Sequence, residues 1–308
     1  MKDVIIIGGG ISAHTAAIYT ARAQLNPIVL AGETPDQLSY TTDVENFPGF
    51  PEGIPGPKLV MDARKQAERF GAKYISEKVL SMELKNNFYE IKTGKNSYQA
   101  KTVIIATGAS ARMLGIPGEE NFFGKGVSSC AVCDAAFYGG KEVVVIGGGD
   151  SAMEEALALY KFASKVTIIH RRDQLRASKI MQERVLKLTD KISVMWDTIP
   201  LEVIGDSKVT GLKVKNVKTN EESVVNCDGV FLAIGHIPNT EPFKGVIDLD
   251  KQGYIIADKA TTSAPGVYAA GDVQDTIFKQ AITSAASGCM AALRAEWFIE
   301  ELKAKGEY

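Results

Sequence analysis

The sequence predicts an α/β protein built from two domains of similar design. The main observation is an internal repeat, in which a short apolar strand, a glycine-rich turn and a helix follow one another twice. The first copy is DVIIIGGGISAHTAAIYTARA from Asp3, and the second is KEVVVIGGGDSAMEEALALYKFA from Lys141. A short apolar segment follows each copy, NPIVLAG after the first and KVTIIHRR after the second. Each copy with its following segment therefore predicts a strand–helix–strand unit of a parallel sheet.

The composition is that of a water-soluble globular protein. Hydrophobic residues make up 45 % of the 308 residues and charged residues 23 %, so the chain is long enough to bury a large core without disulfides. The net charge of −2 gives no reason to expect a nucleic-acid or membrane partner. The apolar runs are too short to span a bilayer, and the N-terminus MKDVIIIGGG lacks the layout of a signal peptide. We therefore expect a cytoplasmic protein.

The rest of the chain predicts further strands and one long helix. Apolar segments that end in Gly or Asp predict strands within 102–110, 229–239 and 266–273. Polar and apolar residues alternate around 74–101 and 201–228, which predicts antiparallel strands. Good helix formers at helical spacing predict a C-terminal helix from about Ala281 to Lys303.

The first glycine turn has the G-x-G-x-x-A spacing of a dinucleotide-binding motif. Gly8 would make the tight turn, Gly10 would let the backbone approach a pyrophosphate, and Ala13 would let the helix pack on the strand. The free N–H groups at the start of the helix would bind the phosphates. A tight turn without a ligand is the alternative, but the position of the motif between a strand and a helix favours a dinucleotide site in a Rossmann-like domain.

The second glycine turn repeats this spacing and differs in the segment that follows it. Its motif supplies the candidate binding residues Gly147, Gly149, Asp150 and Ser151. An NAD site usually places an acidic residue roughly 20 residues further on, where it binds the ribose 2′-hydroxyl. In that place this sequence has basic residues, namely His170, Arg171 and Arg172, with Arg176 a turn later.

These basic residues predict NADPH as the ligand of the second turn. Guanidinium groups bind a 2′-phosphate through charge-assisted hydrogen bonds, whereas a carboxylate would repel it. The alternative is a solvated basic surface, which suits Arg176 better than the His-Arg-Arg triplet.

Two dinucleotide sites in one chain predict electron transfer between two cofactors. A hydride from NADPH needs an acceptor, and a flavin is the usual one, so we expect FAD at the first glycine turn. The segment GVYAAGD ends in Gly271 and Asp272, which would aim a carboxylate at the ribityl hydroxyls. Lys279, Gln280 and Ala281 open the C-terminal helix, whose positive N-terminal end would stabilise an anionic reduced flavin.

The segment SSCAVCDAAF places Cys130, Cys133 and Asp134 together. A zinc site needs four ligands, and the other cysteines, Cys227 and Cys289, stand alone in a chain with three histidines. A structural disulfide is rare in a large cytosolic protein. Two buried core cysteines are a further alternative, and we expect that state for Cys227 and Cys289. A redox-active pair fits best, because the CxxC spacing lowers the pKa of one thiol and favours a reversible disulfide.

Asp134 follows Cys133 directly and is the candidate acid or base of this pair. Its carboxyl group would move protons as the disulfide opens and closes. The alternative role is that of a helix N-cap, and one carboxylate can serve both roles.

Together these motifs resemble one family. The segments that carry the likeness occur in the family's order over essentially the full chain: DVIIIGGG, HTAAIYTARA, TTDVENFPGFPEGI, VIIATGAS, CAVCDAAFYGGKEVVVIGGGDSAMEEA, VTIIHRRDQLRA, VFLAIGHIPNT, GVYAAGDV and KQAITSAASGCMAAL. They are similar to those of the low-molecular-weight thioredoxin reductases. The resemblance implies two Rossmann-like domains, the second inserted in the first, with an FAD domain from 1–112 and 240–308 and an NADPH domain from 113–239. It also implies a homodimer.

The resemblance also implies a path for the electrons. They would pass from NADPH to FAD, then to the Cys130–Cys133 disulfide, and then to the disulfide of a thioredoxin-like protein. Cys130 would attack thioredoxin, Cys133 would contact the flavin, and Asp134 would donate the proton. Members of this family rotate the NADPH domain between two half-reactions, and Gly and Pro recur at 113–118 and 236–242, where we expect the hinges.

The family pattern places FAD contacts on Gly8, Gly10, Ala13, Gln37, Leu38, Asn46, Asp272, Gln280 and Ala281. This sequence departs from the pattern at three places. Ile11-Ser12 replaces a Pro-Ala or similar pair, and Pro35-Asp36 replaces Gly-Gly, which removes backbone freedom beside the flavin. Lys279 replaces the usual Arg before Gln-Ala; it keeps the positive charge at the flavin site but lacks the fork of donors.

Other functions stand as alternatives. The same flavin and dithiol would serve a reductase of a peroxiredoxin system or of a glutaredoxin-like protein, or a variant that takes its electrons from ferredoxin. The triplet His170-Arg171-Arg172 argues against ferredoxin. A non-enzymatic redox sensor or scaffold would keep both glycine turns but would not need Cys-x-x-Cys-Asp. NADPH-driven reduction of a disulfide acceptor separates these alternatives.

Overall fold

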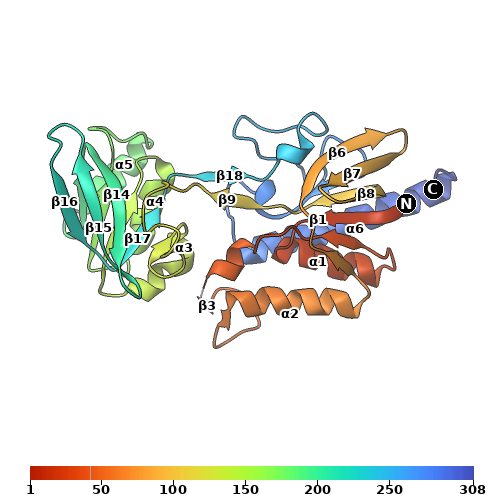
Figure 1. The fold of residues 1–308 in the computed structure, drawn as a ribbon, viewed down its shortest axis with the longest axis horizontal. Helices are drawn as coiled ribbons and strands as arrows, with labels where there is room; N and C mark the ends of the chain where they lie inside the picture. Colours follow the sequence, from red (N-terminus) through yellow and green to blue (C-terminus); the bar gives the residue numbers. More distant parts are fainter. Residues whose placement is uncertain (42) are drawn as a thin grey trace. The chain divides into compact units, whose positions relative to one another are not determined.

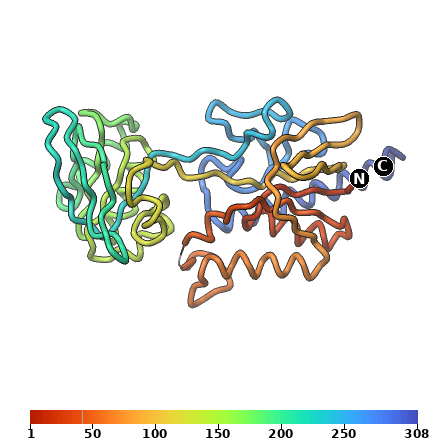
Figure 2. The backbone as a smooth tube through the Cα atoms, in the orientation of Figure 1, coloured from red at the N-terminus to blue at the C-terminus, as the bar shows by residue number. Residues whose placement is uncertain are grey.

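The computed structural model describes residues 1–41 and 43–308. The chain folds into two compact units (Figure 1). Unit 1 combines Met1–Ser110 with Ile237–Tyr308, and unit 2 is the continuous segment Ala111–His236. The backbone trace in Figure 2 leaves unit 1 once and returns to it once. The observed junctions lie at 110/111 and 236/237, compared with 112/113 and 239/240 in the expectation from the family resemblance.

Unit 1 is built on a seven-stranded sheet. Its parallel strands are β5 (Lys73–Ile75), β2 (Ile28–Leu30), β1 (Lys2–Ile7), β8 (Ser97–Ile105) and β19 (Val267–Ala269). β8 also pairs with an antiparallel edge formed by β7 (Phe88–Thr93) and β6 (Val79–Lys85). Because β19 comes from the C-terminal segment, both parts of the chain are needed to complete this sheet.

Three helices accompany the sheet of unit 1, namely α1 (Ile11–Arg22), α2 (Gly56–Arg69) and α6 (Ala281–Lys305). Small residues let α1 and α6 approach closely, since a Cβ at Gly288 would lie 2.2 Å from the carbonyl oxygen of Ser12. Val4, Ile5 and Ile6 of β1 are fully buried, as β-branched residues of a central parallel strand should be. The shorter elements are η1 (Gln37–Tyr40), β3 (Asp43–Val44), β4 (Ile54–Pro55), η3 (Glu241–Phe243) and η4 (Gly271–Val273).

Unit 2 contains two sheets. Its five-stranded parallel sheet has the order β10 (Val127–Ser128), β17 (Gly229–Leu232), β11 (Glu142–Ile146), β12 (Lys165–Ile169) and β13 (Ile192–Met195). A separate antiparallel sheet contains β14 (Thr198–Gly205), β15 (Val209–Asn216) and β16 (Glu222–Asn226). The helices are α3 (Ala131–Asp134), η2 (Ala135–Tyr138), α4 (Asp150–Tyr160) and α5 (Lys179–Leu186).

Two paired strands, β9 (Ala109–Ala111) and β18 (His236–Pro238), carry the chain between the units. Just beyond β9, the buried carboxylate of Glu119 accepts hydrogen bonds of 2.7 Å from the backbone N–H groups of Leu114 and Gly115. The first half of the expected 113–118 hinge is therefore tied to unit 2.

The predicted α/β fold and its elements are confirmed, with local differences. The apolar segments at 102–110 and 229–239 each divide into two strands, because Gly108 and Gly235 adopt positive φ angles of +67° and +98°. Cys227 is buried as expected, but the expectation for Cys289 is wrong, because this residue is partly exposed. In the described part of the chain, the helices are all too short or too polar to cross a bilayer.

Candidate redox-active site

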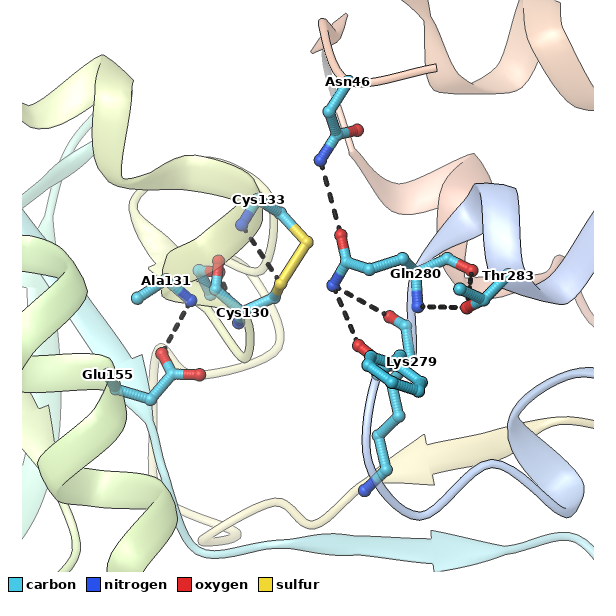
Figure 3. The surroundings of a disulfide bond; sticks show 10 residues. Asn46, Cys130, Ala131, Cys133, Glu155, Lys279, Gln280 and Thr283 are labelled. Carbon is cyan, nitrogen blue, oxygen red and sulfur yellow. Dashed lines mark hydrogen bonds between the residues drawn. A yellow bond between two sulfur atoms is a disulfide. The ribbon is translucent and has the colours of Figure 1, made fainter. Parts of the chain in front are cut away.

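Cys130 and Cys133 form a disulfide in unit 2, with an S–S distance of 2.10 Å (Figure 3). Cys130 is the N-cap residue of α3, and its Sγ accepts a hydrogen bond of 3.2 Å from the backbone N–H of Cys133. The backbone N–H of Cys130 donates in turn to the hydroxyl oxygen of Ser128, at 3.0 Å. The Cys130 sulfur therefore lies at the positive end of a short helix.

The cysteine pair lies at the surface on α3, whose opposite side is buried. Val132, between the two cysteines, is 68 % exposed, and Cys133 is exposed as well. Ala131 and Ala135 point the other way, into the core cluster that also contains residues of α4. Their small side chains let α3 pack directly on α4, which holds the cysteines in place while leaving Cys133 exposed and Cys130 partly exposed.

Asp134 lies partly buried at the end of α3. Burial raises the pKa of its carboxyl group, and a hydrogen bond from Ser128 opposes this shift without cancelling it. A carboxyl with a raised pKa holds its proton closer to neutral pH, as a proton donor should. Asp134 does occupy the N-cap position of η2, as the alternative role expects, but its side chain accepts no capping hydrogen bond there.

A second carboxyl group, which no sequence motif reveals, lies beside the pair. Glu155 on α4 accepts a hydrogen bond of 2.6 Å from the backbone N–H of Ala131, and Figure 3 shows its side chain reaching to the start of α3. Burial is the main reason why the pKa of Glu155 is raised to about 7, and the nearby Asp134 and Glu154 raise it further. The hydrogen bond from Ala131 lowers this pKa but does not cancel the rise. Only the packing of α4 on α3 gives Glu155 this place.

The first glycine turn, between β1 and α1, has the geometry that a dinucleotide needs. Gly8 has a φ of +132°, and a Cβ there would lie 2.1 Å from the carbonyl oxygen of Ala106, just after β8. Gly10 is more open, since its nearest neighbour would be the Cβ of Asp36 at 3.7 Å. Ala13 is fully buried. Among the described residues, no side chain caps the start of α1, so its first N–H groups are left for phosphates to bind.

The second glycine turn, between β11 and α4, repeats this geometry. Gly147 has a φ of +154°, and a Cβ there would lie 2.4 Å from the carbonyl oxygen of Ala233, just after β17. A Cβ at Gly149 would meet no atom within 4 Å. No side chain caps α4, and Ser151 is exposed in its first turn. In both turns the first residue must be glycine because the backbone just after the neighbouring strand leaves no space for a Cβ. The second glycine leaves room for a ligand.

Two residues predicted to bind the ligand of the second turn form hydrogen bonds within the chain. Asp150 Oδ1 accepts hydrogen bonds of 2.8 Å from both the backbone N–H and the hydroxyl of Ser178. His170 is 5 % exposed, and its Nε2 lies 2.9 Å from the carbonyl oxygen of Gln174. A Cβ at Gly148 would lie 2.3 Å from the imidazole ring. These side chains therefore support the glycine turn and the loop beyond β12.

Arg171, Arg172 and Arg176 are exposed beyond the C-terminal end of β12. Burial lowers the pKa of His170, and all three guanidinium groups lower it further, although the carbonyl oxygen of Gln174 opposes them. Three positive charges thus act on one point beside the second glycine turn. Such a cluster can bind a phosphate group.

Asp272 lies in η4, at the end of β19. Its Oδ1 accepts a hydrogen bond of 2.9 Å from the hydroxyl of Ser284 on α6, and burial raises the pKa of its carboxyl group. The N–H of the preceding Gly271 donates to the hydroxyl of Ser287, at 2.8 Å. Helix α6 therefore sets the position of the carboxylate predicted to meet the ribityl chain.

Gln280 is the N-cap residue of α6 and forms a capping box with Thr283. The amide of Asn46 lies 3.4 Å from Gln280 Oε1, so two predicted FAD contacts from distant parts of the sequence come together (Figure 3). Lys279 has a φ of +49°, and its ammonium group lies 5.2 Å from the centre of the Tyr254 ring. Ala281, another predicted contact, is the first residue of α6.

Gln37 and Leu38 lie in η1, which Asp36 caps. The Asp36 carboxylate accepts hydrogen bonds from the backbone N–H of Leu38 at 2.9 Å and from the hydroxyl of Ser39 at 2.6 Å. The family pattern has two flexible glycines at the positions of Pro35 and Asp36. In this chain the Asp36 side chain instead caps η1 and fixes the backbone there.

Comparison with known proteins places this chain in a family. A profile of the pyridine nucleotide-disulphide oxidoreductases matches residues 2–288. The chain is 51 % identical to a thioredoxin reductase of Rickettsia conorii over 97 % of this chain and 98 % of the relative. It is 50 % identical to a thioredoxin reductase of Streptomyces coelicolor, with 98 % and 95 % covered. The chain belongs to the thioredoxin reductase family.

A solved structure agrees with this assignment. The crystal structure of thioredoxin reductase from Streptococcus pyogenes matches with a TM-score of 0.93 and 41 % identity, over 98 % of this chain and 99 % of that chain. Membership of the thioredoxin reductase family confirms the predicted fold and makes this chain a flavoprotein oxidoreductase that uses FAD and NADPH. The two open, uncapped glycine turns fit such dinucleotides.

We expect Gly149→Ala to weaken NADPH binding by about tenfold or more while leaving the fold intact. The added methyl group would meet no atom of the chain within 4 Å, but it would occupy the space in which a pyrophosphate approaches the backbone. The measurement is the NADPH dissociation constant by isothermal titration calorimetry, together with the melting temperature.

Gly147→Ala is the matched control. Its methyl group would lie 2.4 Å from the carbonyl oxygen of Ala233, so this variant should lose stability as well as affinity. An unchanged NADPH affinity in folded Gly149→Ala would contradict a dinucleotide site at this turn.

Proposed function

We propose that this chain is a thioredoxin reductase, an enzyme that uses NADPH to reduce the disulfide of thioredoxin. The observation that carries the proposal is the Cys130–Cys133 disulfide, held at the surface of unit 2 in a chain with two dinucleotide-binding turns. Bound NADPH and FAD supply the two electrons that reduce this disulfide. We place the enzyme in the cytoplasm, where protein thiols are kept reduced.

Cys130 is the sulfur that attacks thioredoxin in this proposal. Reduction breaks the S–S bond, puts a proton on the Cys133 sulfur and leaves Cys130 as a thiolate. The N–H of Cys133 and the N-terminal end of α3 stabilise that thiolate. Cys130 then attacks the thioredoxin disulfide, and Cys133 attacks Cys130 in the resulting mixed disulfide, which releases reduced thioredoxin.

Asp134 supplies the proton for the thioredoxin sulfur that leaves. Burial raises the pKa of its carboxyl group above the ordinary value, which favours the protonated form that a donor needs, and Asp134 follows Cys133 directly in the chain. Asp134 then takes a proton back from the Cys133 thiol as that sulfur attacks Cys130, so the carboxyl group is protonated again when the disulfide has re-formed.

We assign FAD to unit 1 and NADPH to unit 2. The residues proposed to hold FAD are Gly8, Gly10, Ala13, Gln37, Leu38, Asn46, Asp272, Lys279, Gln280 and Ala281. The residues proposed to hold NADPH are Gly147, Gly149, Ser151, Arg171, Arg172 and Arg176, supported by Asp150 and His170. We also propose that unit 2 turns as a body about the β9–β18 connection between the two half-reactions, as the family resemblance implies.

The Cys133→Ser variant should trap thioredoxin as a stable mixed disulfide through Cys130, because the sulfur that would release it is missing. The Cys130→Ser variant keeps only Cys133, which the family resemblance assigns to the flavin and not to thioredoxin, so this variant should trap none. The measurement is a non-reducing gel with mass spectrometry, after each variant is mixed with thioredoxin whose accessible cysteine carries a thionitrobenzoate group. Equal trapping by both variants, or by neither, would contradict the roles assigned to the two cysteines.

Replacing Arg171 and Arg172 together by Ala should raise the KM for NADPH by about tenfold or more and leave the KM for NADH nearly unchanged. Only NADPH carries the 2′-phosphate that these guanidinium groups would bind. Steady-state kinetics with each coenzyme is the measurement. Lys187→Ala removes an exposed cation from the end of α5, where it pairs with Glu183, and should change neither KM. Equal increases for both coenzymes would argue against the assignment.

We further propose that unit 1 pairs with a second copy of this chain. Tyr19 of α1 is 40 % exposed, and Met290 and Trp297 of α6 are 42 % and 54 % exposed. Met290 and Trp297 lie two helical turns apart and so share one face of α6. Cys289, next to Met290 in the chain, raises the pKa of the Tyr19 hydroxyl, which brings Tyr19 close to this face. Exposed apolar side chains grouped in this way favour an interface.

Sedimentation velocity should show about twice the chain mass of 33.2 kDa for the wild type and about the single-chain mass for Trp297→Glu. A buried charge without a partner would make the dimer unstable. Val224→Glu changes a residue of unit 2 that is 54 % exposed and should stay dimeric. A monomeric wild type, or a dimeric Trp297→Glu variant, would speak against this interface.

A further inference from the structure

The start of α3 serves two hydrogen-bond acceptors at once. The backbone N–H of Ala131 donates to Glu155 Oε2 at 2.6 Å, and the backbone N–H of Cys133 donates to Cys130 Sγ at 3.2 Å. Both donors belong to the same first turn, so both acceptors depend on the same positive end of the helix. While the disulfide is closed, the Cys130 sulfur carries no charge, and Glu155 is the acceptor that can be an anion.

The charged groups that act on Glu155 are acidic. Burial is the largest cause of its raised pKa, and Asp134 from α3 and Glu154 from α4 add to it. Tyr138, from η2, has a pKa raised to about 12 by burial and by Asp134, so it stays neutral. None of the ion pairs found within residues 1–41 and 43–308 includes Glu155. A nearby new anion is therefore enough to change its protonation.

We propose that Glu155 is a positioning residue that takes up a proton when the Cys130–Cys133 disulfide is reduced. This inference rests on the redox role proposed above for the pair. Two electrons, supplied by NADPH through FAD, break the S–S bond; one proton binds to the Cys133 sulfur, and Cys130 becomes a thiolate. The thiolate stands next to Ala131 in the chain and repels the carboxylate on its N–H group. A second proton, from solvent, therefore binds to Glu155 and balances the two electrons.

When Glu155 is protonated, the Cys130 thiolate is the only one of the two acceptors that is an anion at the N-terminal end of α3. A neutral carboxyl still accepts the hydrogen bond from Ala131, so α3 stays in place, but it no longer competes as an anion for the positive end of the helix. When Cys130 attacks a disulfide and loses its charge, Glu155 loses its proton again. By taking up the proton, Glu155 thus stops opposing the attacking thiolate, and its hydrogen bond holds α3 at every stage.

The pH dependence of the disulfide follows from this proton. Every proton bound on reduction changes the redox equilibrium constant tenfold for each pH unit. At acidic pH, Glu155 is protonated in both redox states and adds nothing. Above about pH 7 it is ionised beside the disulfide and neutral beside the thiolate, so it adds one proton to the reaction. The wild-type pair should therefore become harder to reduce with rising pH than a pair without this carboxylate.

The test compares the wild-type holoenzyme with Glu155→Gln. Glutamine keeps an oxygen that accepts the hydrogen bond from Ala131, but it cannot bind the proton. The reduced fraction of the Cys130–Cys133 pair is measured in dithiothreitol redox buffers, by alkylation and mass spectrometry. At about pH 5.5 we expect the wild type and Glu155→Gln to have equal equilibrium constants for reduction of the disulfide. By about pH 9 we expect this constant to be about tenfold larger in Glu155→Gln.

Two further variants complete the test. Glu154→Gln removes the neighbouring exposed carboxylate and should keep the extra proton, with its onset at a lower pH because Glu154 no longer raises the pKa of Glu155. Asp134→Asn should keep the extra proton too, because Glu155 remains, and this variant decides the matter if Glu155→Gln does not fold. A constant ratio between wild type and Glu155→Gln at every pH, or loss of the extra proton in Asp134→Asn, overturns the inference. A pair that does not exchange with dithiothreitol at all overturns the proposed function instead.

Discussion

One hydrogen bond, from the backbone N–H of Ala131 to the side-chain carboxylate of Glu155, connects the cysteine pair to α4, the helix that begins at the second glycine turn. The disulfide and the dinucleotide turn of unit 2 therefore share one support. Ala131 and Ala135 complete this contact by packing on the same helix. The exposure of the cysteines, the helix end at the Cys130 sulfur and the acidic surroundings of the pair all depend on α3 being held in this place.

The two glycine turns show how one physical constraint can serve two ligands. In each turn the strand that pairs with the motif's own strand passes so close to the first glycine that no side chain fits, at Ala106 in unit 1 and at Ala233 in unit 2. The second glycine of each turn is then free for a ligand. The residues further along the chain make the two turns different, since three arginines follow the second one and raise the local positive potential.

The sequence predicts those parts of the site whose role depends on local spacing, such as the glycine turns and the CxxC pair. It misses the parts that packing creates. Glu155 looks like any surface carboxylate of an amphipathic helix until α4 packs on α3. His170 stands among arginines that the sequence predicts to bind a ligand, yet its ring lies against Gly148. Lys279, expected beside the flavin as a substitute for arginine, has its ammonium group over the Tyr254 ring.

The central claim is that the Cys130–Cys133 disulfide accepts electrons from NADPH through the bound flavin. An anaerobic titration of the holoenzyme with NADPH, followed by absorbance and by alkylation of the released thiols, tests it most directly. We expect uptake of about two NADPH per chain, one for the flavin and one for the disulfide. We expect uptake of about one per chain when both cysteines are replaced by serine. Uptake of only about one NADPH by the wild type, with the disulfide intact, would contradict it.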